Sequence, residues 1–183
     1  SIKIDGVDTR DMKREDLRSL FGMVLQDTWL FNGTIEENIK YGNFNASKED
    51  VILAAKIANV HHFIKTLPEG YDMVLNEEAS NISQGEKQLL TIARAILSDP
   101  AILILDEATS SVDTRLELML QQAMQNVMKG RTSFVIAHRL STIKSADLIL
   151  VIKDGNIIEQ GNHQELMAKG GFYKELYNSQ FAE

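Results

Sequence analysis

From residue 83 onward, short apolar strands alternate with segments of helical periodicity, and this alternation restricts the possible folds more than any other feature of the chain. The pattern predicts helices over 83–97 and 113–128 and strands over 101–105 and 133–137. Short, almost wholly apolar strands between helices are typical of a parallel sheet with helices on both faces. The predicted fold class is therefore α/β.

Shorter elements are predicted in the rest of the chain. Before residue 83, the pattern predicts strands over 1–4 and 23–25 and helices over 14–21, over 34–40 and from Ser47. After residue 147, it predicts a β-hairpin over 148–160 and helices over 163–168 and 172–181.

Composition excludes several classes of function. A net charge of -7, from 19 basic and 26 acidic residues, opposes non-specific binding to nucleic acid, so we expect no nucleic-acid partner. The absence of cysteine rules out disulfides and cysteine-ligated metal sites. Since no apolar run approaches the roughly 20 residues of a membrane-spanning helix, a membrane role would need a partner or a segment outside this sequence.

Two adjacent carboxylates follow the most apolar predicted strand. Four large apolar residues at 102–105 lead directly into Asp106 and Glu107. In a parallel α/β sheet, ligands bind beyond the carboxyl ends of the strands, where these side chains would emerge. Adjacent strand residues point to opposite sides, so the two carboxylates suit different tasks. The alternative is a pair of acidic residues in an ordinary turn.

Ser83 begins the predicted helix, and Gly85 and Glu86 lie in its first turn. A Ser-x-x-Glu sequence is a common helix capping box, which is the structural interpretation. The free N–H groups and the dipole of such a helix terminus also favour a phosphate group, which is the functional interpretation.

Several segments, in this order, resemble the ATPases of ABC transporters of the exporter type. They are VLQ at 24–26, FNGTIEENI at 31–39, ISQGE at 82–86, ILILDEATSSVD at 102–113 and His138. The resemblance covers nearly the whole chain and implies a P-loop NTPase (RecA-like) fold with a parallel sheet. Residues 1–183 would be a partial ABC ATPase domain. Residues 1–26 and 98–183 would form its RecA-like core, and 27–97 mainly the Q-loop and a helical subdomain with the signature helix.

The resemblance also implies binding and hydrolysis of ATP with Mg²⁺. Asp106 would hold Mg²⁺, largely through water, together with Gln26, and Glu107 would be the general base that activates the attacking water. His138 would contact the γ-phosphate, and Asp113 would reach across a dimer interface.

The signature motif of this family acts on a second subunit. Ser83 and Gly85 would contact the γ-phosphate of the nucleotide bound by the opposite ATP-binding domain. The motif departs from the usual Leu-Ser-Gly-Gly-Gln at Ile82, Gln84 and Glu86. Glu86 would bring an anion close to a phosphate unless its side chain turns into the helix cap. We therefore expect a weakened signature, and the partner is a second ABC ATPase domain in a homodimer or heterodimer, of which the heterodimer is favoured.

The segment after Gln26 implies a membrane partner. In exporters of this family that segment meets the transmembrane domain. Here it contains Trp29 and Phe31, which the sequence leaves open as core residues or as an exposed apolar patch. The implied function is export of drugs, lipids or peptides, with this chain at the cytoplasmic face of the cell membrane.

No segment reads Gly-x-x-x-x-Gly-Lys-Ser/Thr, so the P-loop and the N-terminal strands of the family are missing from this sequence. We therefore expect this chain alone to be inactive as an ATPase. We also expect unpaired sheet edges beside Leu103 and Leu105. Two alternatives stay open: a non-catalytic fragment or dimerisation module, and a soluble ABC-type ATPase of DNA repair or translation.

Overall fold

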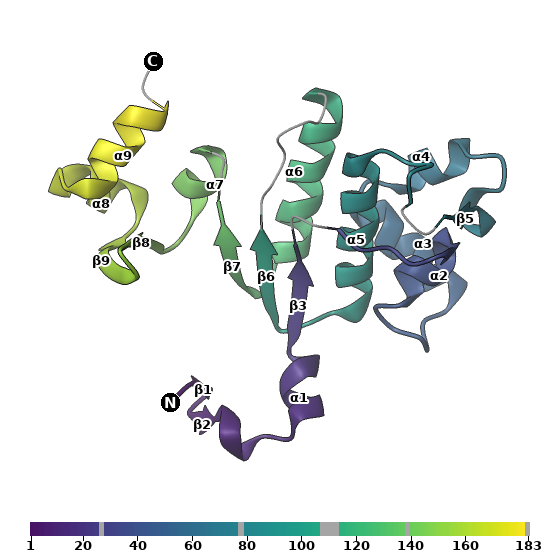
Figure 1. Cartoon of the computed structure of the whole chain (residues 1–183), viewed down its shortest axis with the longest axis horizontal. Coiled ribbons are helices and arrows are strands. Elements are labelled where there is room, and N and C mark those ends of the chain that lie inside the picture. The colour runs from purple at the N-terminus through teal and green to yellow at the C-terminus, as the bar shows by residue number, and fades with distance from the viewer. Residues whose placement is uncertain (26–27, 77–78, 107–113, 138–139, 182–183) are drawn as a thin grey trace. The chain divides into compact units, whose positions relative to one another are not determined.

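The central sheet contains three strands in the order β3 (Phe21–Val24), β6 (Ile102–Asp106) and β7 (Thr132–Ile136). A computed structural model describes residues 1–25, 28–76, 79–106, 114–137 and 140–181. It divides into two compact units, Ser1–Val135 and Ile136–Glu183, which are described separately. β3 is parallel to β6, and the arrows of all three strands point the same way in Figure 1.

β6 is the middle strand of this sheet and pairs with a neighbour on each side. The expectation of unpaired edges beside Leu103 and Leu105 is therefore wrong. The crossovers through the helices carry the chain to opposite sides of β6, so its backbone is hydrogen-bonded to a strand along each edge. In the described sheet, the outer strands are β3 and β7.

Two long helices, α5 (Gln84–Ser98) and α6 (Thr114–Met128), belong to the same hydrophobic core as the sheet. The strand side chains of Leu103 and Leu105 are fully buried. Met23 and Phe134, on the opposite face, are 52% and 57% exposed. In the described part of the first unit, helices therefore cover one face of the sheet, and the expected second cover is not found there.

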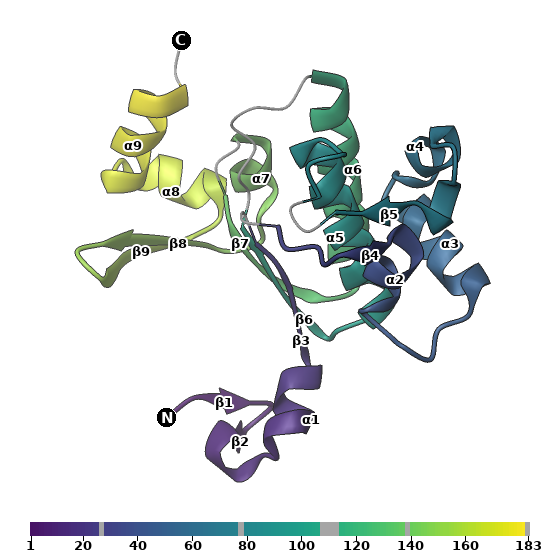
Figure 2. The ribbon, with the colours of Figure 1, turned by 45° about the vertical axis from the view of Figure 1, so that its right-hand side comes forward.

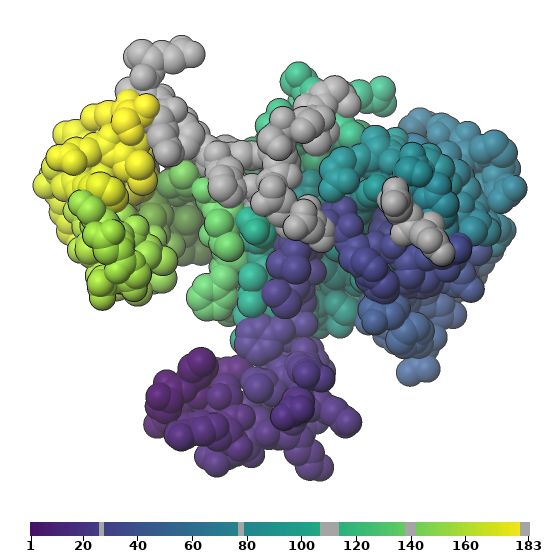
Figure 3. Space-filling view, in the orientation of Figure 1, coloured from purple at the N-terminus to yellow at the C-terminus, as the bar shows by residue number. Residues whose placement is uncertain are grey.

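The helices between β3 and α5 are short; the first two pack against α5, and the third packs against the second (Figure 2). They are α2 (Ile35–Lys40), α3 (Lys48–Ile57) and α4 (His61–Thr66), of which α4 was not expected from the pattern. A small antiparallel pair, β4 (Gly33–Thr34) and β5 (Val74–Leu75), and the 3₁₀ helix η2 (Gly70–Asp72) complete this region. Figure 3 shows these segments as one continuous body. The division of the chain at residues 27 and 97 stays a prediction.

Local sequence accounts for where α2 and α3 begin. The side chains of Thr34 and Ser47 each accept a hydrogen bond from the backbone N–H of the third residue on, and the backbone N–H of each donates one to that residue's carboxylate. This reciprocal arrangement satisfies amide donors that the first helical turn leaves without partners. Gly42 follows α2 because a Cβ atom there would overlap the carbonyl oxygen of Arg94 on α5.

The N-terminal segment of the first unit contains a short hairpin of β1 (Lys3–Ile4) and β2 (Val7–Asp8). The 3₁₀ helix η1 (Thr9–Asp11) and helix α1 (Arg14–Ser19) then lead into β3. In the hairpin turn, Asp5 and Gly6 both have positive φ, which explains why glycine occupies the second position.

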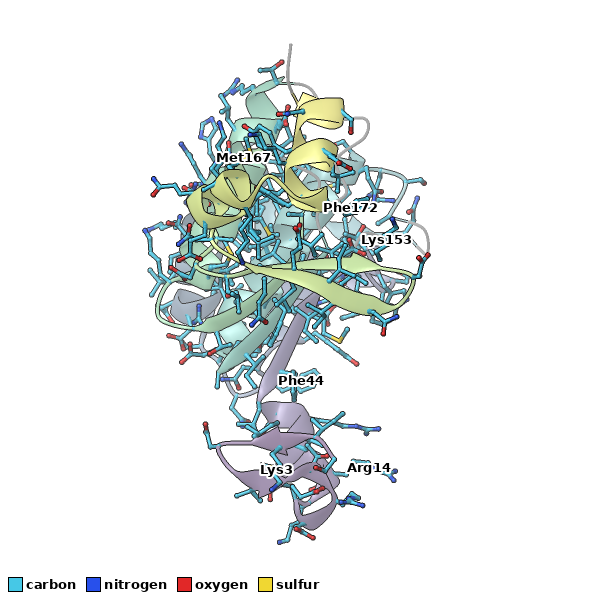
Figure 4. The ribbon with its side chains drawn as sticks, turned by 90° about the vertical axis from the view of Figure 1, so that its left-hand side faces the viewer. Lys3, Arg14, Phe44, Lys153, Met167 and Phe172 are labelled. Atoms are coloured by element: carbon cyan, nitrogen blue, oxygen red, sulfur yellow. The ribbon has the colours of Figure 1, made fainter. Side chains whose placement is uncertain are left out.

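The second unit contains the antiparallel hairpin of β8 (Ile149–Lys153) and β9 (Asn156–Gly161) with three helices. The helices are α7 (Leu140–Ser145), α8 (His163–Lys169) and α9 (Phe172–Phe181). The hairpin confirms the prediction, and both residues of its turn, Asp154 and Gly155, have positive φ. Figure 4 shows Lys153 beside Phe172, with the Lys153 Nζ 4.7 Å from the centre of the ring. Among the described residues, no helix is long and apolar enough to cross a bilayer.

Candidate functional site

The carboxyl ends of β3 and β6 lie side by side at one end of the strands, where a ligand site is expected in a parallel α/β fold. Val24 pairs with Leu105, so the next residues, Leu25 and Asp106, are neighbours at that end. Asp106 is the last residue of β6, and it is partly exposed.

Four of the predicted site residues, Gln26, Glu107, Asp113 and His138, lie outside the described residues. Gln26 and Glu107 follow Leu25 and Asp106 directly in the chain, so the two described strands run to within one residue of both. Among the described residues, no group of three His, Asp or Glu side chains converges as a metal site requires.

The N-terminus of α5 presents Ser83 and Gly85. Ser83 is the N-cap residue, and its Oγ accepts a hydrogen bond from the Glu86 amide at 3.3 Å. The Glu86 carboxylate accepts hydrogen bonds from the Ser83 amide at 2.8 Å and from the Ser83 hydroxyl at 2.7 Å. Gly85 is buried in the first turn. The capping-box interpretation is confirmed, and the Glu86 side chain is folded back onto the cap.

The α5 N-terminus and the carboxyl end of β6 lie at the same end of the first unit. The 15-residue helix is about 22 Å long at 1.5 Å per residue, and residues 99–101 join it directly to β6. Such a short connection makes the two elements run in opposite directions, as Figures 1 and 2 show. Within the first unit, the helix cap and Asp106 therefore come from the same end of the fold.

Loss of the Ser83 hydroxyl should weaken α5. We expect Ser83→Ala to lower the free energy of unfolding by about 1 kcal/mol, because the amide of Glu86 loses its capping acceptor. Urea denaturation of the chain measures this change. Ser98→Ala, at the other end of the helix, is the matched control, and we expect it to stay within about 0.5 kcal/mol of the wild type. Equal losses in the two variants would contradict the role of the cap.

Gln84, one of the unusual residues of the signature segment, contacts the segment that follows Gln26. Its Nε2 donates a hydrogen bond to the Thr28 Oγ1 at 3.1 Å. The two residues are 56 positions apart in the sequence. No signal in the sequence pointed to this contact, because nothing in a local pattern specifies a partner so distant.

Arg94, also on α5, is a second link that the sequence reasoning missed. Its Nε donates to the backbone oxygen of Asn38 at 2.8 Å, and its Nη1 donates to the backbone oxygen of Trp29 at 3.0 Å. Burial lowers the pKa of the guanidinium from its ordinary value, and the nearby Tyr41 opposes this shift. The available signal was a charged residue one turn after the buried Leu90.

Four aromatic rings form a cluster beside Arg94, which we call the aromatic surface: Trp29, Phe31, Tyr41 and Phe44. Neighbouring ring centres in it are 5.4 to 6.0 Å apart. Trp29 is 59% exposed and Phe44 is 70% exposed, whereas Leu30 is buried in the core. The apolar run that the sequence left open is thus divided between the core and an exposed patch.

Comparison with known proteins places this fold in a family. A family model described as ABC transporter matches residues 1–110. An uncharacterized ABC transporter ATP-binding protein of Bacillus subtilis, YfiC, is 56% identical over 98% of this chain and 30% of its own length. A fatty acid ABC transporter ATP-binding/permease protein of Mycobacterium bovis is 56% identical over 96% of this chain and 28% of its own length.

A solved structure of a bacterial Atm1-family ABC exporter with ATP bound has the same fold. It superimposes with a TM-score of 0.90 at 45% identity, over 99% of this chain and 32% of that chain. The chain thus spans about a third or less of the length of the relatives it matches. Since the family model covers more than half of its 183 residues, this chain belongs to the ABC transporter family.

Proposed function

We propose that this chain is part of the ATP-hydrolysing domain of an ABC exporter, with ATP and Mg²⁺ as its cofactors. The observation that supports the proposal is the parallel pairing of β3 and β6, which brings the segments that lead to Gln26 and Glu107 to one edge of the sheet. Asp106 offers a partly exposed carboxylate there, and carboxylate oxygen is a preferred ligand of Mg²⁺. The Asp106 side chain therefore fits the role of one magnesium ligand in such a site.

In the proposed mechanism, each residue has a separate task. Glu107 accepts a proton from the attacking water as general base. Asp106 and Gln26 would hold Mg²⁺, largely through water, and the bound ion would supply neutralisation of the phosphate charge. His138 contacts the γ-phosphate and keeps it in line with Glu107.

We also propose a second ATP-binding domain as partner. Ser83, Gly85 and Asp113 of this chain would complete that domain's site. The Glu86 carboxylate is turned into the helix cap, where it accepts a hydrogen bond from the Ser83 hydroxyl at 2.7 Å, so its expected repulsion of a phosphate is reduced. The departures from the usual signature at Ile82, Gln84 and Glu86 favour a heterodimer in which the signature of this chain faces the weaker of two sites.

We propose the aromatic surface as the contact with a transmembrane domain, with the chain at the cytoplasmic face of the membrane. Trp29, Tyr41 and Phe44 are exposed, and contiguous exposed apolar groups mark interaction sites. The proposed cargo is a drug, a lipid or a peptide. A relative whose name specifies fatty acids makes a lipid the first substrate class to test.

The test is ATP turnover by a full-length exporter that contains these 183 residues, reconstituted in liposomes. We expect magnesium-dependent hydrolysis and uptake of a fluorescent long-chain fatty acid or another amphiphile into the vesicles. Magnesium-dependent binding of a fluorescent ATP analogue without turnover would support the non-catalytic alternative. Turnover stimulated by DNA and independent of a membrane domain would support the soluble ATPase. A homodimer that hydrolyses ATP at both sites would contradict the heterodimer.

A further inference from the structure

The signature helix α5 is hydrogen-bonded to the segment 28–41 at two places. The inference drawn from these contacts rests on the proposed function and adds a role for α5 residues outside the nucleotide site. Near the start of the helix, Gln84 donates to Thr28 at 3.1 Å. Ten residues further along α5, Arg94 donates to the backbone oxygen of Trp29 at 3.0 Å and to that of Asn38 at 2.8 Å. Thr28 is therefore hydrogen-bonded to the first turn of α5, and Trp29 to its second half.

Asn38 extends the contact of Arg94 to the next aromatic residue. Its side chain is fully buried, and its Oδ1 accepts hydrogen bonds from the Arg94 Nη2 at 3.2 Å and from the Phe31 amide at 3.0 Å. The Asn38 Nδ2 donates to the backbone oxygens of Phe31 and Thr34, both at 3.0 Å. The polar atoms of this buried amide are thus all engaged in a single geometry.

The rings of the aromatic surface lie over the same guanidinium. Its central carbon is 5.2 Å from the centre of the Tyr41 ring and 5.9 Å from that of Trp29, which is cation–π distance. One arginine therefore contacts the backbone, an amide and two rings of the segment that carries the exposed patch. A lysine could supply the charge, but it lacks the planar fork that reaches Trp29 and both oxygens of Asn38 together.

We propose that Arg94 is a positioning residue that makes the aromatic surface and the signature helix move as one piece. A shift of the aromatic surface would be carried through Asn38 and Arg94 into α5, and Gln84 would transmit it again at the Ser83 cap. Nucleotide at the signature motif would, by reciprocity, alter the aromatic surface. The link consists of hydrogen bonds between elements 56 to 65 residues apart in sequence, so it exists only in the folded chain.

The first test uses Trp29, the only tryptophan of the chain, as a probe. We expect Arg94→Lys to increase acrylamide quenching of Trp29 fluorescence in the 183-residue chain by about twofold, since the residue loses its backbone anchor. Thr28→Val, a milder change that removes only the acceptor of Gln84, should shift the quenching in the same direction. It keeps the test valid if Arg94→Lys fails to fold.

Arg131→Lys is the matched control. Arg131 is a partly buried arginine that donates to the backbone oxygen of Val127 and pairs with Asp99 rather than with a residue of the aromatic surface. It should change Trp29 quenching by less than a fifth of the Arg94→Lys effect, even if the melting temperature falls equally. Equal quenching in the two arginine variants, or no change in Arg94→Lys and Thr28→Val, would overturn the proposal.

The second test measures transmission in a full-length exporter by hydrogen exchange with and without the magnesium complex of β,γ-imido-ATP. We expect the nucleotide to alter exchange in peptides covering both 84–94 and 28–41 of the wild type, but only in 84–94 of Arg94→Lys. If the nucleotide still alters exchange in both peptides of Arg94→Lys, or in neither, Arg94 has only a structural role and the proposal is overturned. If the wild type shows no nucleotide effect at 84–94, the proposed function fails, and the tryptophan measurement alone decides the role of Arg94.

Discussion

Replacing Glu107 by glutamine in a full-length exporter is expected to lower the rate of ATP hydrolysis by about 100- to 10,000-fold, the range over which a positioned general base contributes. Glutamine keeps the shape of the side chain but cannot accept the proton of the attacking water. Binding should be retained, because Mg²⁺ is assigned to Asp106 and Gln26. The measurements are phosphate release at saturating ATP and the dissociation constant of a fluorescent ATP analogue.

The control for Glu107→Gln is Glu15→Gln, the same chemical change at an exposed position of α1. It should leave hydrolysis within about 1.5-fold of the wild type, as surface substitutions away from special features do. A loss smaller than about tenfold in Glu107→Gln would remove Glu107 from the role of general base. An equal loss of nucleotide binding would instead make it a binding residue.

Leu105→Ala is the stability change with the largest expected effect. Leu105 is fully buried in the middle strand of the sheet, between β3 and β7. Removing a buried leucine side chain forfeits its transfer free energy and leaves a cavity, so we expect a loss of about 3 kcal/mol. Such a loss shifts the folding equilibrium by more than 100-fold. Urea denaturation followed by Trp29 fluorescence reports it for the first unit.

Met23→Ala is the matched control on the opposite face of the same sheet. Met23 is 52% exposed and pairs in register with Ile104 of β6. We expect it to cost less than about 1 kcal/mol, because little apolar area returns to water. Equal losses for Leu105→Ala and Met23→Ala would contradict the one-sided cover of the sheet in the described part of the first unit.

The predictable parts of this protein are those determined by neighbouring residues. The caps at Thr34 and Ser83 require only a hydroxyl and a carboxylate three residues apart, so the sequence predicts them correctly. Strand and helix periodicity likewise predicts β6 and α5 to within a residue or two. The edge that carries Asp106 follows from the rule that parallel strands place their carboxyl ends together.

The order of the strands could not be predicted in the same way. The residues before 103 and after 105 contain no information about which strand lies on each side of β6, and the expectation of an unpaired edge there was wrong. Periodicity shows which side chains alternate between the two faces of the sheet, but it does not show whether helices cover one face or both. That depends on crossovers between distant segments.

The amino-acid sequence by itself determined the helix caps, the apolar strands, the family and the positions of the candidate site residues along the chain, because these depend on local chemistry or on short motifs. Only the tertiary structure decided the strand order, the division of Leu30 and Trp29 between core and surface, and the Arg94–Asn38 link. Each of these depends on packing between segments far apart in sequence. A buried arginine takes its partners from the elements that fold around it, and those partners are known only once the chain has folded.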